Sequence, residues 1–541
     1  MTDSVDLILI CQSNVVNYDG SSTLPLEELS RYQTLIYPRM VRHGDRFVSH
    51  LDAINLIKHG QTYFEADYPG RRERLNIWNM PSASGLHLAN LLSGEGIRTK
   101  IINNLDSEWD LFVAAYGACR RPPLVGISST FYLGFKEIGR IARRLRAVDA
   151  DMDIMVGGAH ANSKVLSTGV GSLEQPMRKY GIDYVLHAFN SDADLRDVLL
   201  ARRDGRGLDA VRNLTYFENR DRAKGRFVTT ATQWNTPMLD EVPANWHRIE
   251  APFLNRTLQI RTASGCPFSC AFCSYPTTAG GWKTIDPARV RQHLDSVKAI
   301  PGIDRLIFID DTFNVPKQRF KELLNIFKDY DFEWFSFLRV QYVDDDIVRA
   351  MKDSGCRGVY LGVESADDRV LANMNKKARR ADFARGIDLL NKYDISSLSA
   401  FVLGFPGEDD KSIRTNIDFI ENCGVSFYSL KEFFYMEHTD VHKRREEFGL
   451  TGMGNSWSHR TMDYSQAAEI KLQMFREIKN AISVDPDTSL WYMAYLYDQG
   501  YDFDRIAAVQ RGLNGVMDDQ LGGEMGLDTA AWTALKAAVA P

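Results

Sequence analysis

Three cysteines, Cys266, Cys270 and Cys273, stand within eight residues of one another in the segment ASGCPFSCAFCSYP. Thiolates gathered in this way are ligands for a soft metal ion or for an iron–sulfur cluster. A structural zinc site normally has four protein ligands, often as two separated pairs, whereas the other cysteines of this chain stand singly at positions 11, 119, 356 and 423. Three thiolates on one loop suit three irons of a [4Fe–4S] cluster and leave the fourth iron open for a substrate or cosubstrate to chelate.

These cysteines follow the first of six strand-like runs that alternate with helix-like stretches between residues 256 and 445. The runs cover residues 257–263, 305–311, 333–340, 358–365, 396–405 and 425–435. Six such units predict an open partial (βα)6 barrel, short of the full eight-fold one. Because βα barrels carry their chemistry at the carboxyl ends of the strands, the cysteine loop is expected on the functional rim.

Polar and small residues end the later strands of this predicted barrel, where they would meet a ligand bound at the rim. They are Asp310 and Asp311 after the second strand, Arg339 after the third, Glu364 and Ser365 after the fourth, and Gly404 and Pro406 after the fifth. For the carboxylates, the alternative is a structural task as a helix N-cap or in a rim salt bridge.

The first part of the chain predicts a second α/β unit. Strand-like runs at residues 5–11, 75–80, 99–104, 124–131, 152–158 and 184–187 alternate with amphipathic stretches, which indicates a parallel, doubly wound, Rossmann-like sheet over residues 1–205. Ligands on such sheets bind beyond the carboxyl ends of the strands. Residues 206–255 are expected to be a linker, residues 256–445 the barrel, and residues 446–541 a C-terminal helical domain.

The C-x3-C-x2-C spacing, with Phe272 just before the last cysteine, resembles the signature of radical S-adenosylmethionine (SAM) enzymes. The resemblance implies that the open iron binds the amine and carboxylate of SAM, and that one-electron reduction cleaves SAM to a 5′-deoxyadenosyl radical. It further implies that Arg339 faces the SAM carboxylate and that Glu364 and Ser365 face its amino-acid and ribose portions. The other residues expected at this cofactor are Phe272, Asp310, Asp311, Gly404 and Pro406.

Two segments of the first α/β unit, LVGISSTFYLGFKEIGRIARRLR and MDIMVGGAHA, resemble the cobalamin-binding domains attached to some radical SAM barrels. The resemblance implies that cobalamin binds near two stretches, Ser128, Ser129 and Thr130 in the first and Gly157, Gly158 and His160 in the second. The D-x-H-x-x-G motif, whose histidine ligates cobalt in some cobalamin proteins, is absent. A domain that keeps this fold without the cofactor is therefore the alternative.

Three functions compete at this point. The layout resembles cobalamin-dependent methyltransferases, including the phosphinate P-methyltransferases, which would methylate a carbon or phosphorus centre in natural-product biosynthesis. A radical SAM peptide epimerase is the second reading, and it would need a thiol hydrogen donor at the barrel mouth. An iron–sulfur redox regulator is the third. His459, in the glycine-rich segment GMGNSWSHRTMD, and Tyr435, at the end of the sixth strand, are the candidate catalytic residues.

The composition of the chain limits the kinds of molecule that we expect it to bind. The chain has 541 residues, a formal net charge of −6 and no apolar run long enough to span a membrane, so neither a nucleic acid nor a membrane is expected as a partner. We expect a cytoplasmic protein, since the first residues lack the pattern of a signal peptide. The expected partners are a small-molecule or peptide substrate and an external one-electron reductant.

Overall fold

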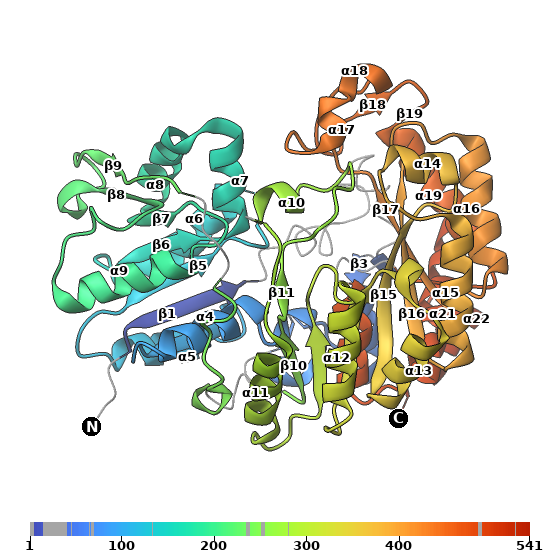
Figure 1. Cartoon of the computed structure of the whole chain (residues 1–541), viewed down its shortest axis with the longest axis horizontal. Coiled ribbons are helices and arrows are strands. Elements are labelled where there is room, and N and C mark those ends of the chain that lie inside the picture. The colour runs from blue at the N-terminus through green and yellow to red at the C-terminus, as the bar shows by residue number, and fades with distance from the viewer. Residues whose placement is uncertain are drawn as a thin grey trace.

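Two mainly parallel sheets, each flanked by helices, lie side by side in the computed structural model (Figure 1). The structure describes residues 5–13, 40–44, 46–63, 65–66, 70–132, 134–233, 238–249, 255–279, 281–484, 489–524 and 526–540. The expected α/β class, with a Rossmann-like unit followed by a partial barrel, is confirmed.

The first sheet has the strand order β4-β1-β5-β6-β7-β8-β9. Its strands are β1 (Leu7–Gln12), β4 (Thr99–Asn104), β5 (Leu124–Ser128), β6 (Ile154–Gly157), β7 (Tyr184–Leu186), β8 (Leu214–Phe217) and β9 (Phe227–Thr229). The strands from β4 to β7 run parallel, while β8 and β9 pair antiparallel at one edge. Numbered along the chain, the parallel strands have the order 2-1-3-4-5, which puts the topological switch point between β1 and β5.

Helices cover both faces of this sheet because the side chains of each strand alternate between the faces. Leu7 and Leu9 pack with α4 (Ala83–Ser93) and α9 (Asp192–Asp204). Ile8 and Ile10 face the other side. That side is covered by α5 (Trp109–Gly117), α6 (Phe135–Arg146), α7 (Ala159–Thr168) and α8 (Glu174–Tyr180).

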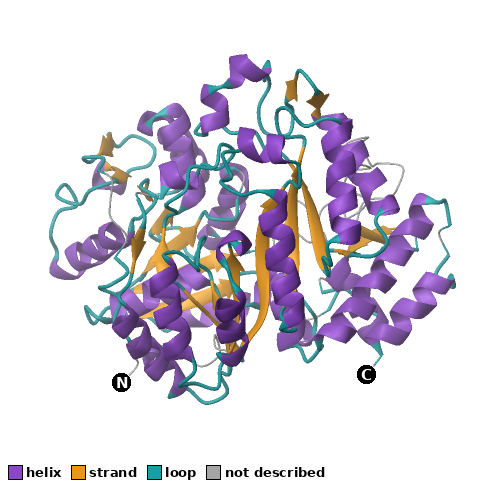
Figure 2. Cartoon of the chain, turned by 45° about the vertical axis from the view of Figure 1, so that its right-hand side comes forward, coloured by secondary structure: helices purple, strands orange, loops and turns teal. Residues whose placement is uncertain are grey.

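The second sheet is an open barrel with the order β10-β13-β14-β15-β16-β17-β20, and all of its pairs are parallel. Its strands are β10 (Thr257–Ile260), β13 (Arg305–Phe308), β14 (Glu333–Leu338), β15 (Cys356–Glu364), β16 (Ser396–Leu403), β17 (Phe427–Glu432) and β20 (Ile482–Ser483). The helices between them are α11 (Pro287–Lys298), α12 (Lys317–Phe327), α13 (Asp345–Asp353), α14 (Asp368–Asn373), α15 (Arg380–Lys392) and α16 (Asp410–Asn422). Figure 2 shows the strands of both sheets among the helices that cover them. All six predicted barrel strands are present.

Three expectations about the domains need correction. Within the expected linker, β8 and β9 extend the first sheet; positions 234–237 and 250–254 of that linker lie outside the described residues. Within the expected helical domain, β20 adds a seventh strand to the barrel. The hairpin of β2 (Met40–His43) and β3 (Arg46–Ser49), with α3 (His50–His59), was expected in the first domain but buries its apolar side chains against the C-terminal helices.

Those helices are α19 (Tyr464–Glu477), α20 (Ser489–Asp498), α21 (Phe503–Leu521) and α22 (Ala530–Val539). Helix α20 packs on the barrel strands rather than on a separate core: Trp491 contacts Phe337 edge-on, and Tyr497 contacts Phe335 in the same way. None of the described helices is long and apolar enough to cross a membrane.

The predicted strand at residues 75–80 is also wrong. Ile77–Asn79 form a single 3₁₀ turn, in which the Asn76 side chain accepts a hydrogen bond from the Trp78 N–H. Short polar side chains of this kind compete with strand pairing by bonding to nearby backbone, and the apolar residues around the turn pack instead against the C-terminal helices.

Candidate functional site at the junction of the two sheets

The cysteine loop leaves β10 at the carboxyl end of the barrel, as predicted. It begins with a small hairpin, β11 (Ala263–Ser264) against β12 (Lys283–Thr284). Gly265 then adopts φ +78°, and a Cβ at this position would collide with the carbonyl oxygen of Gly281. Only glycine fits where the chain both enters the left-handed region and passes this close to another backbone. The turn into Cys266 therefore depends on Gly265.

Asp310 fastens the start of the loop. Its carboxylate is fully buried and accepts hydrogen bonds from the Thr262 N–H at 2.6 Å, the Ala263 N–H at 2.9 Å and the Thr262 hydroxyl. Arg319, also buried, donates to the carbonyl oxygens of Thr262 and Ile285. Asp310 was expected to contact the cofactor, but the loop occupies its oxygens, so it is a positioning residue.

The far side of the loop is held by the fourth barrel unit and by the segment after β17. The Ala271 N–H donates to the Met374 carbonyl, and the Ala271 carbonyl accepts from the Val441 N–H, both at 2.8 Å. Asn375 donates to the Ser269 carbonyl and hydroxyl. The loop is therefore braced by backbone hydrogen bonds from two other parts of the barrel rim.

Polar groups contact two of the three thiols directly. Thr312 Oγ1 lies 3.2 Å from Cys266 Sγ, and Arg339 Nη2 donates to Cys270 Sγ at 3.1 Å. The Arg339 guanidinium also lies over the Phe268 ring, 3.6 Å from its centroid. A guanidinium held in this way stabilises negative charge on sulfur.

The three thiols are close enough to interact electrostatically, and burial together with the other two thiols raises the pKa of Cys273 to about 11. Binding of iron must therefore displace the thiol proton. Among the residues that the structure describes, no three His, Cys, Asp or Glu side chains converge on one point suited to a single metal ion. A cubane cluster needs no such point, because each thiolate binds a different iron. The donor set thus fits a [4Fe–4S] cluster.

Glu364 stands at the carboxyl end of β15 with φ +67° and is paired with Lys376, whose Nζ lies 2.9 Å from Glu364 Oε1. Both side chains are largely buried. A non-glycine residue in the left-handed region stores strain of the kind found at ligand sites. The predicted contact to SAM would be made at this end of the strand.

The remaining rim residues have structural partners. The Ser365 hydroxyl is fully buried, donates to Asn416 Oδ1 and accepts from the Asp367 N–H. Gly404 donates its N–H to Glu408 Oε2 at 2.6 Å, and Pro406 continues the same turn, where its carbonyl accepts from Asn373. The Phe272 ring packs edge-on against Phe405, in the turn that follows β16. These residues shape the rim and present backbone to it.

Asp311 differs from its neighbour Asp310 because its side chain reaches solvent. The surrounding protein still raises the pKa of Asp311 to about 6, while the Tyr275 hydroxyl and the positive charge of Arg261 act in the opposite direction. Asp311 and Tyr275 thus flank the cysteine loop as a hydrogen-bonded pair.

The two candidate catalytic residues lie in a packed cluster above the fifth and sixth strands. His459 Nε2 donates to the Gly404 carbonyl at 3.0 Å, its ring stacks on Trp457, and Thr461 bonds to Nδ1. Burial lowers the pKa of His459. Tyr435 is buried, and its hydroxyl lies 2.8 Å from His442 Nδ1. Both ring nitrogens of His459 are in use, so the geometry supports a structural role for it.

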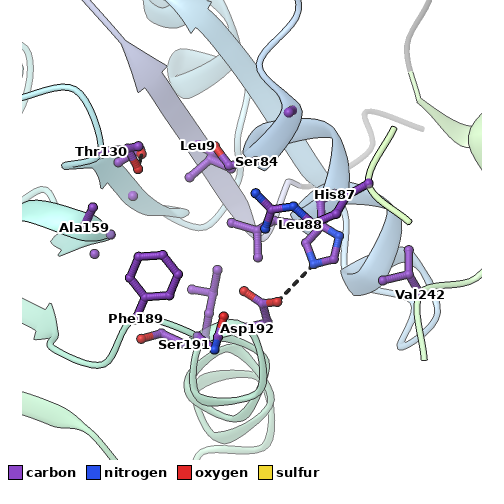
Figure 3. Close-up of a pocket in the computed structure, with 18 of the residues that line it drawn as sticks. Leu9, Ser84, His87, Leu88, Thr130, Ala159, Phe189, Ser191, Asp192 and Val242 are labelled. Atoms are coloured by element: carbon purple, nitrogen blue, oxygen red, sulfur yellow. Dashed lines mark hydrogen bonds and ion pairs between the residues drawn. The ribbon is translucent and has the colours of Figure 1, made fainter. Parts of the chain in front are cut away.

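A cavity of about 250 Å³ lies between the first sheet and β10 (Figure 3). Strands β5 and β6 contribute Gly126, Ser128 and Gly157 to its wall, Gly158 and Thr130 follow these strands, and β10 is followed there by Arg261. The other walls are α4 and the start of α9, which His87 and Asp192 connect through a 3.0 Å ion pair. The cavity is at the switch-point side of the sheet, where ligands of such folds bind.

The predicted serine- and glycine-rich turns are thus brought together, with one exception. A Cβ on Gly158, which has φ +107°, would come within 3.1–3.3 Å of Thr130 Oγ1 and of the Ser129 N–H and hydroxyl. The Ser129 hydroxyl is buried and accepts from the Ala161 N–H. His160 points elsewhere: it packs on Phe135 on the opposite side of the sheet and does not line the cavity.

Sequence reasoning missed three residues of this junction, His87, Asp192 and Lys376. His87 and Asp192 are 105 positions apart, so no local spacing could pair them. Asp192 begins α9 after β7, and that position was the available signal, whereas His87 lies inside α4. Lys376 follows Glu364 by 12 residues in an irregular stretch, where no periodicity indicates a direction.

Comparison with known proteins agrees with this geometry. Residues 260–420 match the profile of the Radical SAM superfamily. An uncharacterized methyltransferase of Pyrococcus horikoshii is 26% identical over 57% of this chain and 65% of its own length. The bacteriochlorophyllide d C-12(1)-methyltransferase of Chlorobaculum tepidum is 25% identical over 32% of this chain and 39% of its own length. The chain thus spans less than two thirds of these relatives.

Two solved structures share the fold over nearly the whole chain. The radical S-adenosylmethionine methyltransferase TsrM from Kitasatospora setae, with cobalamin and a [4Fe–4S] cluster bound, has a TM-score of 0.62 and 15% identity, covering 96% of this chain and all of that one. The cobalamin-dependent S-adenosylmethionine radical enzyme OxsB has a TM-score of 0.56 and 13% identity, and the match covers 99% of this chain and 78% of that one. At these identities the likeness shows a common fold.

Proposed function

We propose that this chain is a cobalamin-dependent radical SAM methyltransferase. The observation that carries the proposal is the cavity between the first sheet and β10, because this cavity lies at the switch-point side of the sheet and directly beside the strand from which the cysteine loop emerges. Both structural neighbours are described as using cobalamin with SAM, and the curated relatives include methyltransferases.

The residues around the cavity fit cobalamin. Its wall is mostly apolar, from Leu9, Leu88 and Leu195, which suits a flat heterocycle. At its rim, the Ser128 and Thr130 hydroxyls and the backbone of Gly157 and Gly158 can bond to corrin amides. His87 of α4 lines the same wall, and its Nε2 is bonded to Asp192 at the start of α9. Because the D-x-H-x-x-G motif is absent from the sequence, any cobalamin here would lack the histidine ligand that this motif supplies.

When bound, the cluster and SAM supply a carbon-centred radical and cobalamin supplies a transferable methyl group. Cys266, Cys270 and Cys273 would hold the cluster, with Arg339 stabilising charge on the thiolate of Cys270. Glu364, kept in place by Lys376, would face the amino-acid portion of SAM. Phe405, Phe433 and Tyr435 pack with Trp457 beside the barrel rim, and these aromatic side chains keep water out of that part of the rim.

The positions of the other four cysteines favour methyl transfer over epimerisation. Cys356 begins β15 at the opposite end of the barrel from the loop, and Cys423 ends α16 just before β17. Cys11 is buried against α4, where burial raises its pKa to about 12, and Cys119 follows α5. None of the four is a thiol at the barrel mouth from which a substrate radical could take a hydrogen atom.

The substrate proposed is an unactivated carbon or phosphorus centre in a small-molecule or peptide natural product. An external one-electron reductant would be needed to cleave SAM, and no nucleic acid or membrane is required. The localisation proposed is the cytoplasm.

The decisive test is anaerobic reconstitution with iron, sulfide and hydroxocobalamin, followed by gel filtration and an absorbance spectrum. We expect retained cobalamin in the wild type. A Gly157→Ala variant should retain it, since a Cβ there makes only ordinary contact with Leu186, whereas Gly157→Phe fills the cavity and should release it. Wild-type protein that retains no cobalamin would refute the proposed function, and equal retention by Gly157→Phe would refute the site.

The cluster is tested separately with Cys273→Ala. This variant should lose most of its iron and should not cleave SAM under reducing conditions, because a cluster ligand is missing. SAM cleavage at the wild-type rate would overturn the assignment of the loop.

A further inference from the structure

A second hollow, of about 780 Å³, lies on the other side of the first sheet from the cofactor cavity. Its walls come from the start of α6, from the length of α7 and from α8, and Phe434, which follows β17, completes the rim. Of these three helices, α7 lies next to α10 (Tyr275–Thr278), as Figure 1 shows. The hollow is distinct from the cavity described above, although Thr130 and Ala159 line both.

Positive charge from three helices surrounds this hollow. Lys136 comes from α6, Lys164 from α7 and Lys179 from α8, and no ion pair connects any of them to another residue in the described part of the chain. Arg143 adds a fourth cation over the ring of Tyr180, 5.9 Å from its centroid. Of the described residues that line the hollow, none is acidic. In a chain with net charge −6, such a local excess of cations is a specific feature.

The neutral groups of the hollow add hydrogen-bonding capacity for an anion. Ser163 presents a hydroxyl, whereas the hydroxyls of Ser167 and Thr168 already donate to the carbonyl oxygens of Ser163 and Lys164. Helix α6 begins after Gly134 without a side-chain cap, so its first N–H groups add positive partial charge. The nearest acid, Glu137 in the first turn of α6, interacts with His160, and burial lowers the pKa of that histidine. His160 Nε2 has no hydrogen-bond partner among the described residues.

The hollow leads toward the cysteine loop. A neighbouring hollow of about 500 Å³ shares Ala159, Ser163, Ser167 and Phe434 with it and continues to Ser274 and Tyr275, next to Cys273. The exposed Phe434 ring stands where the two meet. A ligand could therefore rest one end among the lysines and pass its other end over Phe434 to the barrel mouth.

From this arrangement we propose that the lysine hollow binds the phosphate- or phosphonate-type end of the substrate. A compact group with two negative charges and three oxygens matches cations that converge from three helices, whereas a single carboxylate offers too few acceptors. This inference deepens the proposed methyltransferase function by naming the substrate class, and it rests on that function for its link to the reaction. The anion site itself is independent of whether cobalamin binds.

The test is calorimetric titration of the full-length chain with inorganic pyrophosphate in 0.15 M salt. The triple variant Lys136→Gln, Lys164→Gln, Lys179→Gln should weaken binding by about tenfold or more, because it removes the charge-assisted donors. The control triple variant Lys298→Gln, Lys321→Gln, Lys411→Gln removes equal charge from exposed positions on the barrel helices and should leave the affinity unchanged. Absence of pyrophosphate binding, or equal weakening by both triple variants, would overturn the proposal.

Two further measurements separate the alternatives. Hexaglutamate that binds more tightly than pyrophosphate, and loses affinity in the first triple variant, would replace the proposed ligand with an acidic peptide. Cobalamin retention and SAM cleavage should be normal in both triple variants, since none of these lysines belongs to either site. Wild-type protein that binds pyrophosphate but retains no cobalamin would refute the methyltransferase while leaving the anion site intact.

Discussion

Replacing Asp310 with alanine should release the cysteine loop from the barrel. The buried carboxylate accepts bonds from two backbone N–H groups and one hydroxyl of residues 262 and 263. Alanine leaves all three donors without an acceptor, and each unsatisfied buried group costs about 1–3 kcal/mol. Because the loop can relax toward solvent, we expect a loss near the lower end of the sum, about 3–5 kcal/mol. This is a large share of the stability of a typical domain, about 5–15 kcal/mol.

The assay has two readouts, iron and sulfide per chain after anaerobic reconstitution and the denaturant midpoint of the cluster-free chain. Asp310→Ala should lower both. Asp310→Asn should fall between it and the wild type, because the amide oxygen still accepts the backbone N–H groups. Asp304→Ala is the matched control, since it removes a partly exposed acid at the other end of β13. If Asp310→Ala binds iron as the wild type does and unfolds at the same denaturant concentration, the loop is not held by this carboxylate.

Three other changes test the site. Gly265→Ala should abolish cluster binding while the barrel stays folded, because the added Cβ collides with the Gly281 carbonyl. Iron content measures cluster binding and circular dichroism measures folding. A variant that binds iron as fully as the wild type would contradict this prediction. Burial raises the pKa of Glu408 to about 8 from 4.5. Between these two pH values the folded chain therefore keeps a proton that the unfolded chain releases. The free energy of unfolding should fall between pH 4.5 and 8 by up to about 1.4 kcal/mol per pH unit. Glu408→Gln should flatten that dependence, and a pH profile identical to that of the wild type would assign it to another group. His459→Asn should lower the unfolding free energy by about 1–2 kcal/mol and leave SAM cleavage per cluster unchanged, whereas lost turnover at normal stability would restore an acid–base role.

Strand positions were predictable because a buried parallel strand leaves a continuous apolar run. All six expected barrel strands exist, and five of the six expected in the first unit do. In the exception, residues 75–80, the apolar residues are interrupted by Asn76, whose side chain caps a 3₁₀ turn. Conversely, β8, β9 and β20 are only two to four residues long, too short for alternation to distinguish them from loops.

The grouping of the three cysteines was predictable from their spacing, because one loop supplies all three. The roles of the carboxylates were not predictable, since Asp310 and Asp311 are adjacent in sequence and the alternation of a strand end sends one into the loop and the other to solvent. His459 illustrates the same limit. Its sequence context left an acid–base role and a structural role open, but two partners that are two and 55 positions away use both ring nitrogens.

Gln259, near the end of β10, explains how the cavity and the cysteine loop keep their relative position. Its side-chain oxygen accepts from the Trp491 indole N–H at 2.7 Å, and its nitrogen donates to the Pro81 carbonyl at 2.6 Å. One buried amide thus connects the first barrel strand to helix α20 and to the entry of α4, the helix that carries His87. Since the same strand continues into the cysteine loop, any displacement of α4 from the barrel would move the cavity wall relative to the cluster. Helix α20 therefore helps to fix the position of the cavity relative to the cysteine loop, although it contributes no residue to the cavity wall.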